Sequence, residues 1–518
     1  MPSNTSNSDA SMRANSPSGP PQRYHPVAME LDGPTVDAVV ANEAVGSQSS
    51  SAATMTRLVT CFWILGLLNN ASYVIMIACA KSISEGGTAL VFLANIVPSL
   101  AVKATAPYWF DKVHYRTRLQ AATICMMTSF ILVAGTSARA AAALNQVDKD
   151  HPAPASITGE AVGTGIDANL SSKTPSTTMT HLLLIQLLGV SFGSAQCGLG
   201  EASLLALAGK VDGAASGSEH DKGRCLTSFS SGTGMAGVFG FFWKWVWNDC
   251  VGLSMSTTVW LAMILAVGYW WSFQYAQRQQ ESLERETGDD EDVLDTTEKL
   301  SDEEELPNET QALAPSSTDS GRPIVTPIPE MTPRERFQLV LSLWPYMIPL
   351  FVVYAAEYAL QSGTWTAIGF PLENMEARDR FYEFSNWAYQ AGVFVSRSSG
   401  TLFTAPMSLL WLMPALQFAN LGLYTYVASH PNFSAVYRPG VLYGGALYTG
   451  LLGGAVYIHG YKRICLDLPV AHREFSLSAT SVAEGIGVLV ADAVGLVIES
   501  CLYKVNKLEG ALFSCPIR

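Results

Sequence analysis

Two carboxylates lie inside strongly apolar stretches of the chain, where a charge is costly and is a functional hypothesis by default. Glu201 follows Gly198 and Gly200 in the stretch 194–203, and Glu357 lies in the most hydrophobic part of the stretch 338–362. Burial disfavours the charged form of a carboxylate, so both residues are candidate proton sites. The alternative is a structural carboxylate, satisfied by an arginine, tyrosine or serine of another helix.

A cation stands in a third apolar stretch. Arg397 lies in the run Tyr389–Ser399, flanked by serine hydroxyls. Its planar guanidinium could bind a carboxylate or a phosphate through two parallel hydrogen bonds, and Tyr389 is a further candidate of the same run. The side chain could equally snorkel to the membrane interface, because Arg397 is close to the end of its span.

Hydroxyls and glycines open another span. Ser231 and Thr233 belong to the run Ser230–Gly234, where the small residues favour close helix packing. A polar helix start that faces an anionic substrate is the alternative. Glu484 and Asp492 are eight residues apart, can lie near one helix face, and are further candidates for a proton path.

Long apolar helices must position these side chains. Of the 518 residues, 48% are hydrophobic and 14% are charged, against about 25% charged in soluble domains. Several apolar blocks exceed the roughly 20 residues that cross a bilayer, which predicts a polytopic membrane protein embedded in lipid. We expect about eleven spans, near 56–80, 88–110, 118–142, 179–209, 226–248, 252–276, 338–362, 384–399, 402–428, 439–461 and 474–503.

The charge is concentrated in one loop. The formal net charge is −13, and residues 281–309 hold 14 acidic and two basic side chains. Like charges at this density favour a solvated, disordered segment. The predicted organisation is a disordered cytosolic N-tail (1–55), a six-span half (56–276) with a lumenal loop (143–178), an acidic disordered cytosolic loop (277–337), and a second half of about five spans (338–518).

Basic residues set the expected orientation. The connection between the second and third spans carries Lys112, Arg116 and Arg118, and the connections between the fourth and fifth and between the tenth and eleventh spans carry three basic residues each. The positive-inside rule therefore places these loops, the N-terminus and the acidic loop in the cytosol. The sequons at Asn169 and Asn432 then face the other side and are candidate glycosylation sites.

Six spans, a long polar loop and five further spans are typical of an all-α, major-facilitator-like bundle of two halves. The motif Asp111-Lys112 resembles that superfamily's loop signature in a degraded form. We find no nucleotide-binding, hydrolase or metalloprotease motif in a fitting context, so an enzyme and a cofactor are not expected. The nine cysteines form no CxxC pair, and neither a zinc site nor a disulfide framework is expected. The absence of a basic, aromatic patch argues against nucleic acid as a partner.

Seven segments, taken in order, resemble the battenin family of lysosomal and vacuolar membrane proteins. They are Gly66–Val74, Gly198–Glu201, Ser230–Gly234, Val352–Tyr358, Tyr389–Ser399, Gly450–Tyr457 and His472–Phe475. The resemblance implies a fungal vacuolar membrane protein involved in transport and pH homeostasis. Family members are linked to arginine transport and, in animals, to clearance of glycerophosphodiesters. Glu201, Glu357 and Arg397 fall on matching positions.

Two departures from the family pattern limit what the resemblance implies. Thr449 stands where an acidic residue is expected, which weakens proton coupling through that span, and Cys515-Pro516-Ile517-Arg518 is a poor prenylation signal. The leading hypothesis is a transporter that couples protons to a small polar solute. The alternative is a membrane scaffold whose acidic loop recruits trafficking partners or regulators of the proton pump.

Overall fold

The computed structural model describes residues 36–79, 88–150, 177–214, 223–301, 331–431, 436–509 and 514–516. Two compact units divide the chain, Met1–Ser50 and Ser51–Arg518. The described residues of the first unit form the beginning of helix α1 (Val36–Ala78). The second unit holds the rest of α1 and all the other elements, and its described residues contain helices and turns but no strand.

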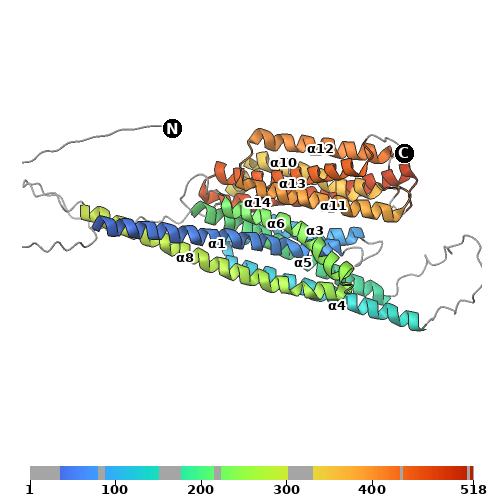
Figure 1. Ribbon diagram of the computed structural model, residues 1–518, viewed down its shortest axis with the longest axis horizontal. Coiled ribbons are helices and arrows are strands. Elements are labelled where there is room, and N and C mark those ends of the chain that lie inside the picture. The colour runs from blue at the N-terminus through green and yellow to red at the C-terminus, as the bar shows by residue number, and fades with distance from the viewer. Residues whose placement is uncertain are drawn as a thin grey trace, which may run out of the picture. The chain divides into compact units, whose positions relative to one another are not determined.

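The helices of the second unit gather into two groups (Figure 1). The N-terminal half contains α1, α3 (Thr88–Trp109), α4 (Tyr115–Asp150), α5 (Thr177–Ala214), α6 (Arg224–Lys244), α7 (Met255–Leu261) and α8 (Met263–Ser301). The C-terminal half contains α9 (Pro333–Ser342), α10 (Trp344–Ala359), α11 (Met375–Ser398), α12 (Met407–Ser429), α13 (Pro439–Asp467) and α14 (Val470–Asn506). This confirms the predicted all-α bundle of two halves.

Each predicted span coincides with one long helix or with a consecutive pair, α7–α8 or α9–α10. Five helical stretches are long and apolar enough to cross a membrane on that criterion alone: Ala52–Ala78, Tyr115–Arg139, His181–Gly213, Pro439–Asp467 and Val470–Asn506. The stretches Pro333–Ser342 and Trp344–Ala367 meet the criterion only when they are counted together, and the chain bends by 61° between them. The chain is therefore a multi-pass membrane protein.

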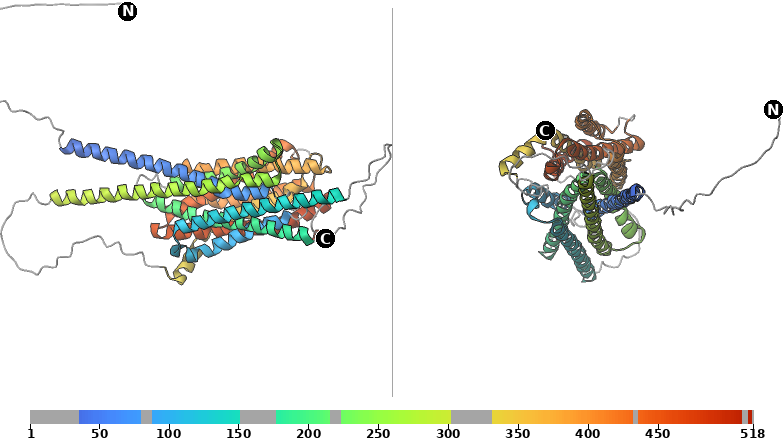
Figure 2. Two further views of the ribbon diagram at one scale, coloured as in Figure 1. Left: turned by 90° about the horizontal axis from the view of Figure 1, so that it is seen from below. Right: turned by 90° about the vertical axis from the view of Figure 1, so that its left-hand side faces the viewer.

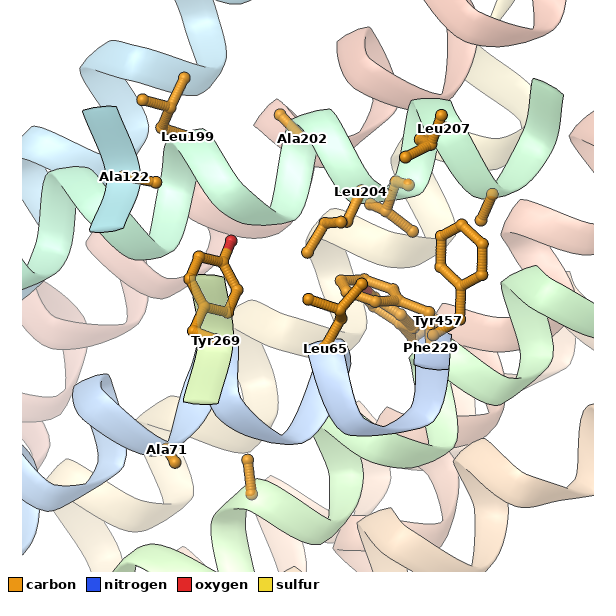
Figure 3. Close-up of a cluster of buried hydrophobic side chains, with 14 of the residues drawn as sticks. Leu65, Ala71, Ala122, Leu199, Ala202, Leu204, Leu207, Phe229, Tyr269 and Tyr457 are labelled. Carbon is orange, nitrogen blue, oxygen red and sulfur yellow. The ribbon is translucent and has the colours of Figure 1, made fainter. Parts of the chain in front are cut away.

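The two halves meet along a few helices. Helix α14 packs on α3 and α5 of the other half, and α6 packs on α11 and α13. The apolar core reaches across this boundary, because Leu65 of α1, Leu204 of α5 and Phe229 of α6 lie together with Tyr457 of α13 (Figure 3). Side chains at the α3–α14 and α6–α11 contacts are thus placed between the halves.

Small residues bring two helix pairs close together. A Cβ at Gly232 of α6 would lie 2.0 Å from the Trp63 carbonyl oxygen of α1, and one at Gly450 of α13 would lie 2.1 Å from the Tyr389 carbonyl oxygen of α11. Only glycine leaves room for backbones at this separation. The packing interpretation of the run Ser230–Gly234 is therefore supported for its glycines.

The structure differs from the sequence-based segment boundaries at both polar ends of the N-terminal half. Helix α8 continues to Ser301, inside the segment expected to be a disordered loop, and it extends beyond the helices of the C-terminal half (Figure 2). Helix α1 begins at Val36, inside the expected N-tail. The α8 extension contains good helix formers such as Glu and Lys, and in α8 the Gln277 amide donates to the Glu281 carboxylate one turn on, at 3.1 Å.

A disulfide corrects the prediction from the scattered cysteines. Cys501 in the last turns of α14 is bonded to Cys515. The helix ends at Asn506, and the next residue, Lys507, has a φ of 54° that turns the chain back. This reversal brings Cys515 to Cys501. The candidate glycosylation sites Asn169 and Asn432 lie outside the described residues.

Candidate functional site

A lysine of α3 holds two carboxylates. Lys103 Nζ lies 2.8 Å from Glu201 Oε2 of α5 and also bonds the carboxylate of Glu484 on α14. At most 7% of any of the three side chains is exposed. A buried carboxylate with a bonded cation can stay ionised, because the Coulomb attraction offsets much of the lost hydration. Glu201 and Glu484 are thus brought together, although the sequence separates them widely.

Tyr457 of α13 connects this cluster to Arg397 of α11. Its hydroxyl donates to Glu201 Oε1 at 2.6 Å, and the Arg397 guanidinium lies over its ring at 3.9 Å from the centroid. Such a cation–π contact is favourable, and more so away from water. The contacts therefore run without a break from Lys103 in one half to Arg397 in the other.

Arg397 points into the bundle rather than towards the interface. It donates to the Thr233 hydroxyl of α6 and, at 2.9 Å, to the Tyr354 hydroxyl of α10. The structure thus argues against the snorkelling alternative. No ion pair joins Arg397 to a carboxylate among the described residues, and its Nε is buried without a hydrogen-bond partner. The guanidinium is a cation that only hydroxyls and a ring satisfy.

The hydroxyl of Ser231 lies at a cleft beside Arg397. Ser231 Oγ is 2.8 Å from Ser398 Oγ and accepts from the Trp63 indole at 3.2 Å. The cleft has a volume of about 680 Å³, and Trp63, Ser231, Ser398, Phe403 and Lys462 are among its lining residues. These residues come from both halves, so the cleft lies at the boundary between the halves. Ser231 and Thr233 therefore have polar contacts of their own, while Gly232 and Gly234 pack against neighbouring helices.

Glu357 is brought to a separate pocket. Its side chain is buried, with 1% of the residue exposed, and Oε1 accepts from the Tyr389 hydroxyl at 3.2 Å. Oε2 has no hydrogen-bond partner in the part of the chain that the structure describes, and it lies against Gly453 of α13, where a Cβ would be 1.8 Å away. Among the described residues no cation is bonded to this carboxyl. A negative charge therefore costs more here than on Glu201 or Glu484, which Lys103 compensates.

Comparison with known proteins shows the family of the chain. The sequence pattern of the family described as CLN3 protein matches residues 60–147 and 170–505. The chain belongs to the CLN3 (battenin) family. Protein BTN1 of Debaryomyces hansenii is 28% identical over 458 residues, covering 86% of this chain and 94% of that protein. Protein btn-1 of Neurospora crassa is 28% identical over 464 residues, covering 86% and 88%.

A solved transporter shares the fold. The proton:xylose symporter XylE, a major facilitator protein, matches this CLN3-family chain with a TM-score of 0.54 at 11% identity, covering 89% of this chain and 92% of that one. At this identity the likeness concerns the fold alone. Family and fold together identify a transporter-like membrane protein.

Lys103 is the residue of this CLN3-family site that the sequence analysis missed. It lies within the predicted span 88–110, and the rule that singled out Glu201, an ionisable residue inside an apolar span, applies to it equally. Tyr354 and Tyr457 carry no such signal, because tyrosines are common in membrane helices. Asp492 is half-buried.

The charges of this site do not balance. Lys103 and Arg397 supply two positive charges, whereas the buried Glu201, Glu357 and Glu484 supply up to three negative ones. A low-dielectric interior penalises the excess negative charge, and one bound proton removes it. The arrangement is therefore suited to taking up and releasing one proton, and Arg397 offers a binding point for an anionic group.

Proposed function

We propose that the chain is a proton-linked transporter of a small polar solute in the vacuolar membrane, where it contributes to pH homeostasis. One observation carries the proposal: buried acidic and basic side chains from both halves meet at the boundary between them, from Lys103 to Arg397. Alternating access in this fold moves one half against the other around such a site. The name of XylE, a proton:xylose symporter, supports the same chemistry.

Arg397 is the proposed contact for the solute. Its guanidinium has hydroxyl partners but no bonded carboxylate among the described residues, so a carboxylate or phosphodiester of the solute can bind it by paired hydrogen bonds. Arginine and glycerophosphodiesters both carry such a group. Glu357 is the proposed proton carrier, because its second oxygen has no partner and the proton would remove an uncompensated charge.

The proposed orientation keeps the N-terminus and the even-numbered loops in the cytosol. The disulfide between Cys501 and Cys515 supports it, because it lies at the opposite end of α14 from the basic connection before Val470. Disulfides persist in oxidising compartments and are rare in the cytosol. A bonded Cys515 also has no free thiol to prenylate.

The test uses sealed vesicles that contain only this protein, with an acidic interior and either labelled arginine or a labelled glycerophosphodiester outside. We expect gradient-dependent flux that Glu201→Gln and Glu357→Gln abolish while both variants fold. Arg397→Lys, which keeps the charge but loses the planar fork, should reduce flux about tenfold. Lys244→Gln is the matched control, since Lys244 forms a surface ion pair with Asp249, away from the site. Flux that survives both glutamine variants would disprove the mechanism.

No flux of either solute by folded protein would instead favour the scaffold. Deletion of residues 281–309 then becomes the informative variant, because the scaffold hypothesis places partner recruitment in that acidic segment. A vacuolar pH defect after this deletion, with normal pH control in Glu201→Gln and Glu357→Gln, is the pattern expected of a scaffold.

A further inference from the structure

Lys103 has one bonded partner in each half of the molecule. Helix α3 packs on α5 of its own half and on α14 of the other. The Lys103 ammonium follows the same division, with Glu201 on α5 and Glu484 on α14. All three residues are buried, with 4%, 5% and 5% exposed. One side chain thus reports whether the halves are in contact at α3 and α14.

Separating the halves here has unequal effects on the two bonds. The bond between Lys103 and Glu201 joins helices of one half and can persist. The bond between Lys103 and Glu484 must break, which leaves a buried carboxylate without its cation. Removing one partner from a buried ion pair is strongly unfavourable unless the remaining charge is neutralised. A proton on Glu484 neutralises it at no cost to Lys103, which stays bonded to Glu201.

We propose that Lys103 and Glu484 form a proton-controlled latch between the halves. When α3 and α14 separate, Glu484 takes one proton from water and Lys103 remains an ammonium on Glu201. When they close, the proton leaves and the ion pair reforms. The latch rests on the proposed proton-linked transport, and it assigns Glu484 as the carboxylate that ties protonation to conformation, with Lys103 as its positioning residue.

The surroundings of Glu484 leave Lys103 as its bonded cation. The titratable and charged groups that act on this region are Glu201 and Cys197 of α5, Tyr73 of α1, Tyr354, Glu357 and Tyr358 of α10, Arg397 of α11, Tyr457 and Tyr461 of α13, and Asp492 of α14 itself. Arg397 is the other cation among these described residues, and its hydrogen bonds go to Thr233 and Tyr354. Among the described residues, Lys103 is the cation that the structure bonds to Glu484.

Glu357 differs from Glu484 in a way that separates their roles. Both lie in the C-terminal half, but the described residues give Glu357 no bonded cation in either half. Separation of α3 from α14 breaks no bond of Glu357, so its proton is not tied to this contact. Glu484 exchanges an ammonium for a proton at the contact itself.

The latch can be tested without knowing the solute, by measuring the distance between spin labels. The labels are placed by Tyr108→Cys at the end of α3 and Val470→Cys at the start of α14, both exposed positions, after replacing the accessible Cys125 and Cys250 by serine. The full chain is held in nanodiscs of phosphatidylcholine. We expect acidification to shift the distance distribution from close to separated.

Four variants decide the outcome. Glu484→Gln should be separated at neutral pH and insensitive to acidification. Lys103→Arg should behave as the parent, whereas Lys103→Gln should move the midpoint of separation by about one pH unit or more to the alkaline side, because the competing cation is gone. Lys244→Gln, which removes a surface lysine paired with Asp249, should change nothing.

Two results would overturn the latch. The first is a distance between the labels of the parent chain that does not depend on pH. The second is a pH midpoint of separation that is the same in Glu484→Gln and Lys103→Gln as in the parent. The Lys103 variants keep the test decisive if Glu484→Gln does not fold. Vesicle flux separates the two proposals. A pH-dependent distance that Glu484→Gln abolishes, without flux of either solute, upholds the latch and rejects transport. Flux of a solute, together with a pH response of the distance that is the same in Glu484→Gln and Lys103→Gln as in the parent, upholds transport and rejects the latch.

Discussion

The two halves contain a pocket of the same design with different chemistry. In the N-terminal half, Asn69 Oδ1 of α1 lies against Gly200 of α5, where a Cβ would be 1.9 Å away. In the C-terminal half, Glu357 Oε2 of α10 lies against Gly453 of α13, where a Cβ would be 1.8 Å away. In each case the first long helix of a half directs a polar side chain at a glycine of the fourth.

The hydrogen bonding of the two pockets differs. Asn69 Oδ1 accepts from Gln196 and Tyr269, each at 3.0 Å, and its amide donates to Asn70 and to the Cys197 carbonyl. Glu357 has one bond, from Tyr389. A neutral, fully bonded amide suits a rigid support, whereas a half-bonded carboxyl can gain or lose a proton. We therefore expect the Asn69 pocket to stabilise the fold and the Glu357 pocket to take part in function.

The largest expected effect is on the stability of the first pocket. Gly200→Ala should lower the free energy of unfolding by about 3–5 kcal/mol, because the new methyl overpacks a buried site and forces Asn69 off its partners. Gly453→Ala should cost less, about 1–3 kcal/mol, since the Glu357 oxygen it meets has no bond to lose. Unfolding of the purified variants in mixed micelles measures both, and equal losses would contradict the comparison.

Replacing the Asn69 amide by a carboxyl tests the comparison of the two pockets in a second way. Asn69→Asp keeps the shape of the side chain but replaces an amide donor by an oxygen that faces the Cys197 carbonyl and the Asn70 side chain. We expect a loss of about 2–4 kcal/mol in the free energy of unfolding from two broken buried bonds. Asn69→Leu is a useful control, because it removes the same donors without adding a charge. If Asn69→Asp is tolerated without loss of stability, this pocket, too, can hold a proton.

Glu357→Gln should have a small effect on the same measurement. The amide oxygen can still accept from Tyr389, and the substitution removes an ionisable group that no cation compensates among the described residues. We expect a change within about 1 kcal/mol in the free energy of unfolding, together with loss of gradient-driven flux. Glu201→Gln is the contrasting variant, since it leaves the Lys103 ammonium with one carboxylate fewer. If Glu357→Gln is the more destabilising of the two, Glu357 is a structural carboxylate.

Much of this site follows from local sequence, but its pairings do not. Glu201, Glu357 and Arg397 are conspicuous because a charge in an apolar span is rare, and the structure buries both carboxylates. The partner of Glu201 is Lys103, from a helix about a hundred residues away. Periodicity reports which residues share a helix face and carries no information on which helices meet.

The extent of α8 did not follow from charge density either. The acidic run after residue 277 predicts a solvated segment, and in the structure α8 continues to Ser301. Glutamate, glutamine, lysine and arginine have high helix propensity, and a helix that already exists is cheap to extend by one residue. The disulfide of Cys501 was missed because the reversal at Lys507, a non-glycine residue at positive φ, gives no turn signal in the sequence.

A third carboxylate, that of Glu335, contrasts with Glu357. The effect expected from its protonation is the smallest of these predictions. Glu335 is exposed at the first turn of α9, outside the predicted spans, and accepts from the Thr332 amide at 2.7 Å and hydroxyl at 2.9 Å. These bonds lower the pKa of Glu335 below its usual value of 4.5. A depressed folded-state pKa adds stability above the unfolded pKa, and this stability is lost as pH falls through the folded one.

We therefore expect the first turn of α9 to fray on acidification. Hydrogen exchange of its amides, corrected for the intrinsic pH dependence, should lose protection at acidic pH in the parent chain. Thr332→Ala removes the donor hydroxyl and the reciprocal cap on the Glu335 amide, so protection should be low at every pH. Protection that is equal at neutral and acidic pH would show that the carboxylate contributes nothing there. A satisfied surface carboxylate then acts only on its own helix turn, whereas Glu357 owes its proposed role to the bond it lacks.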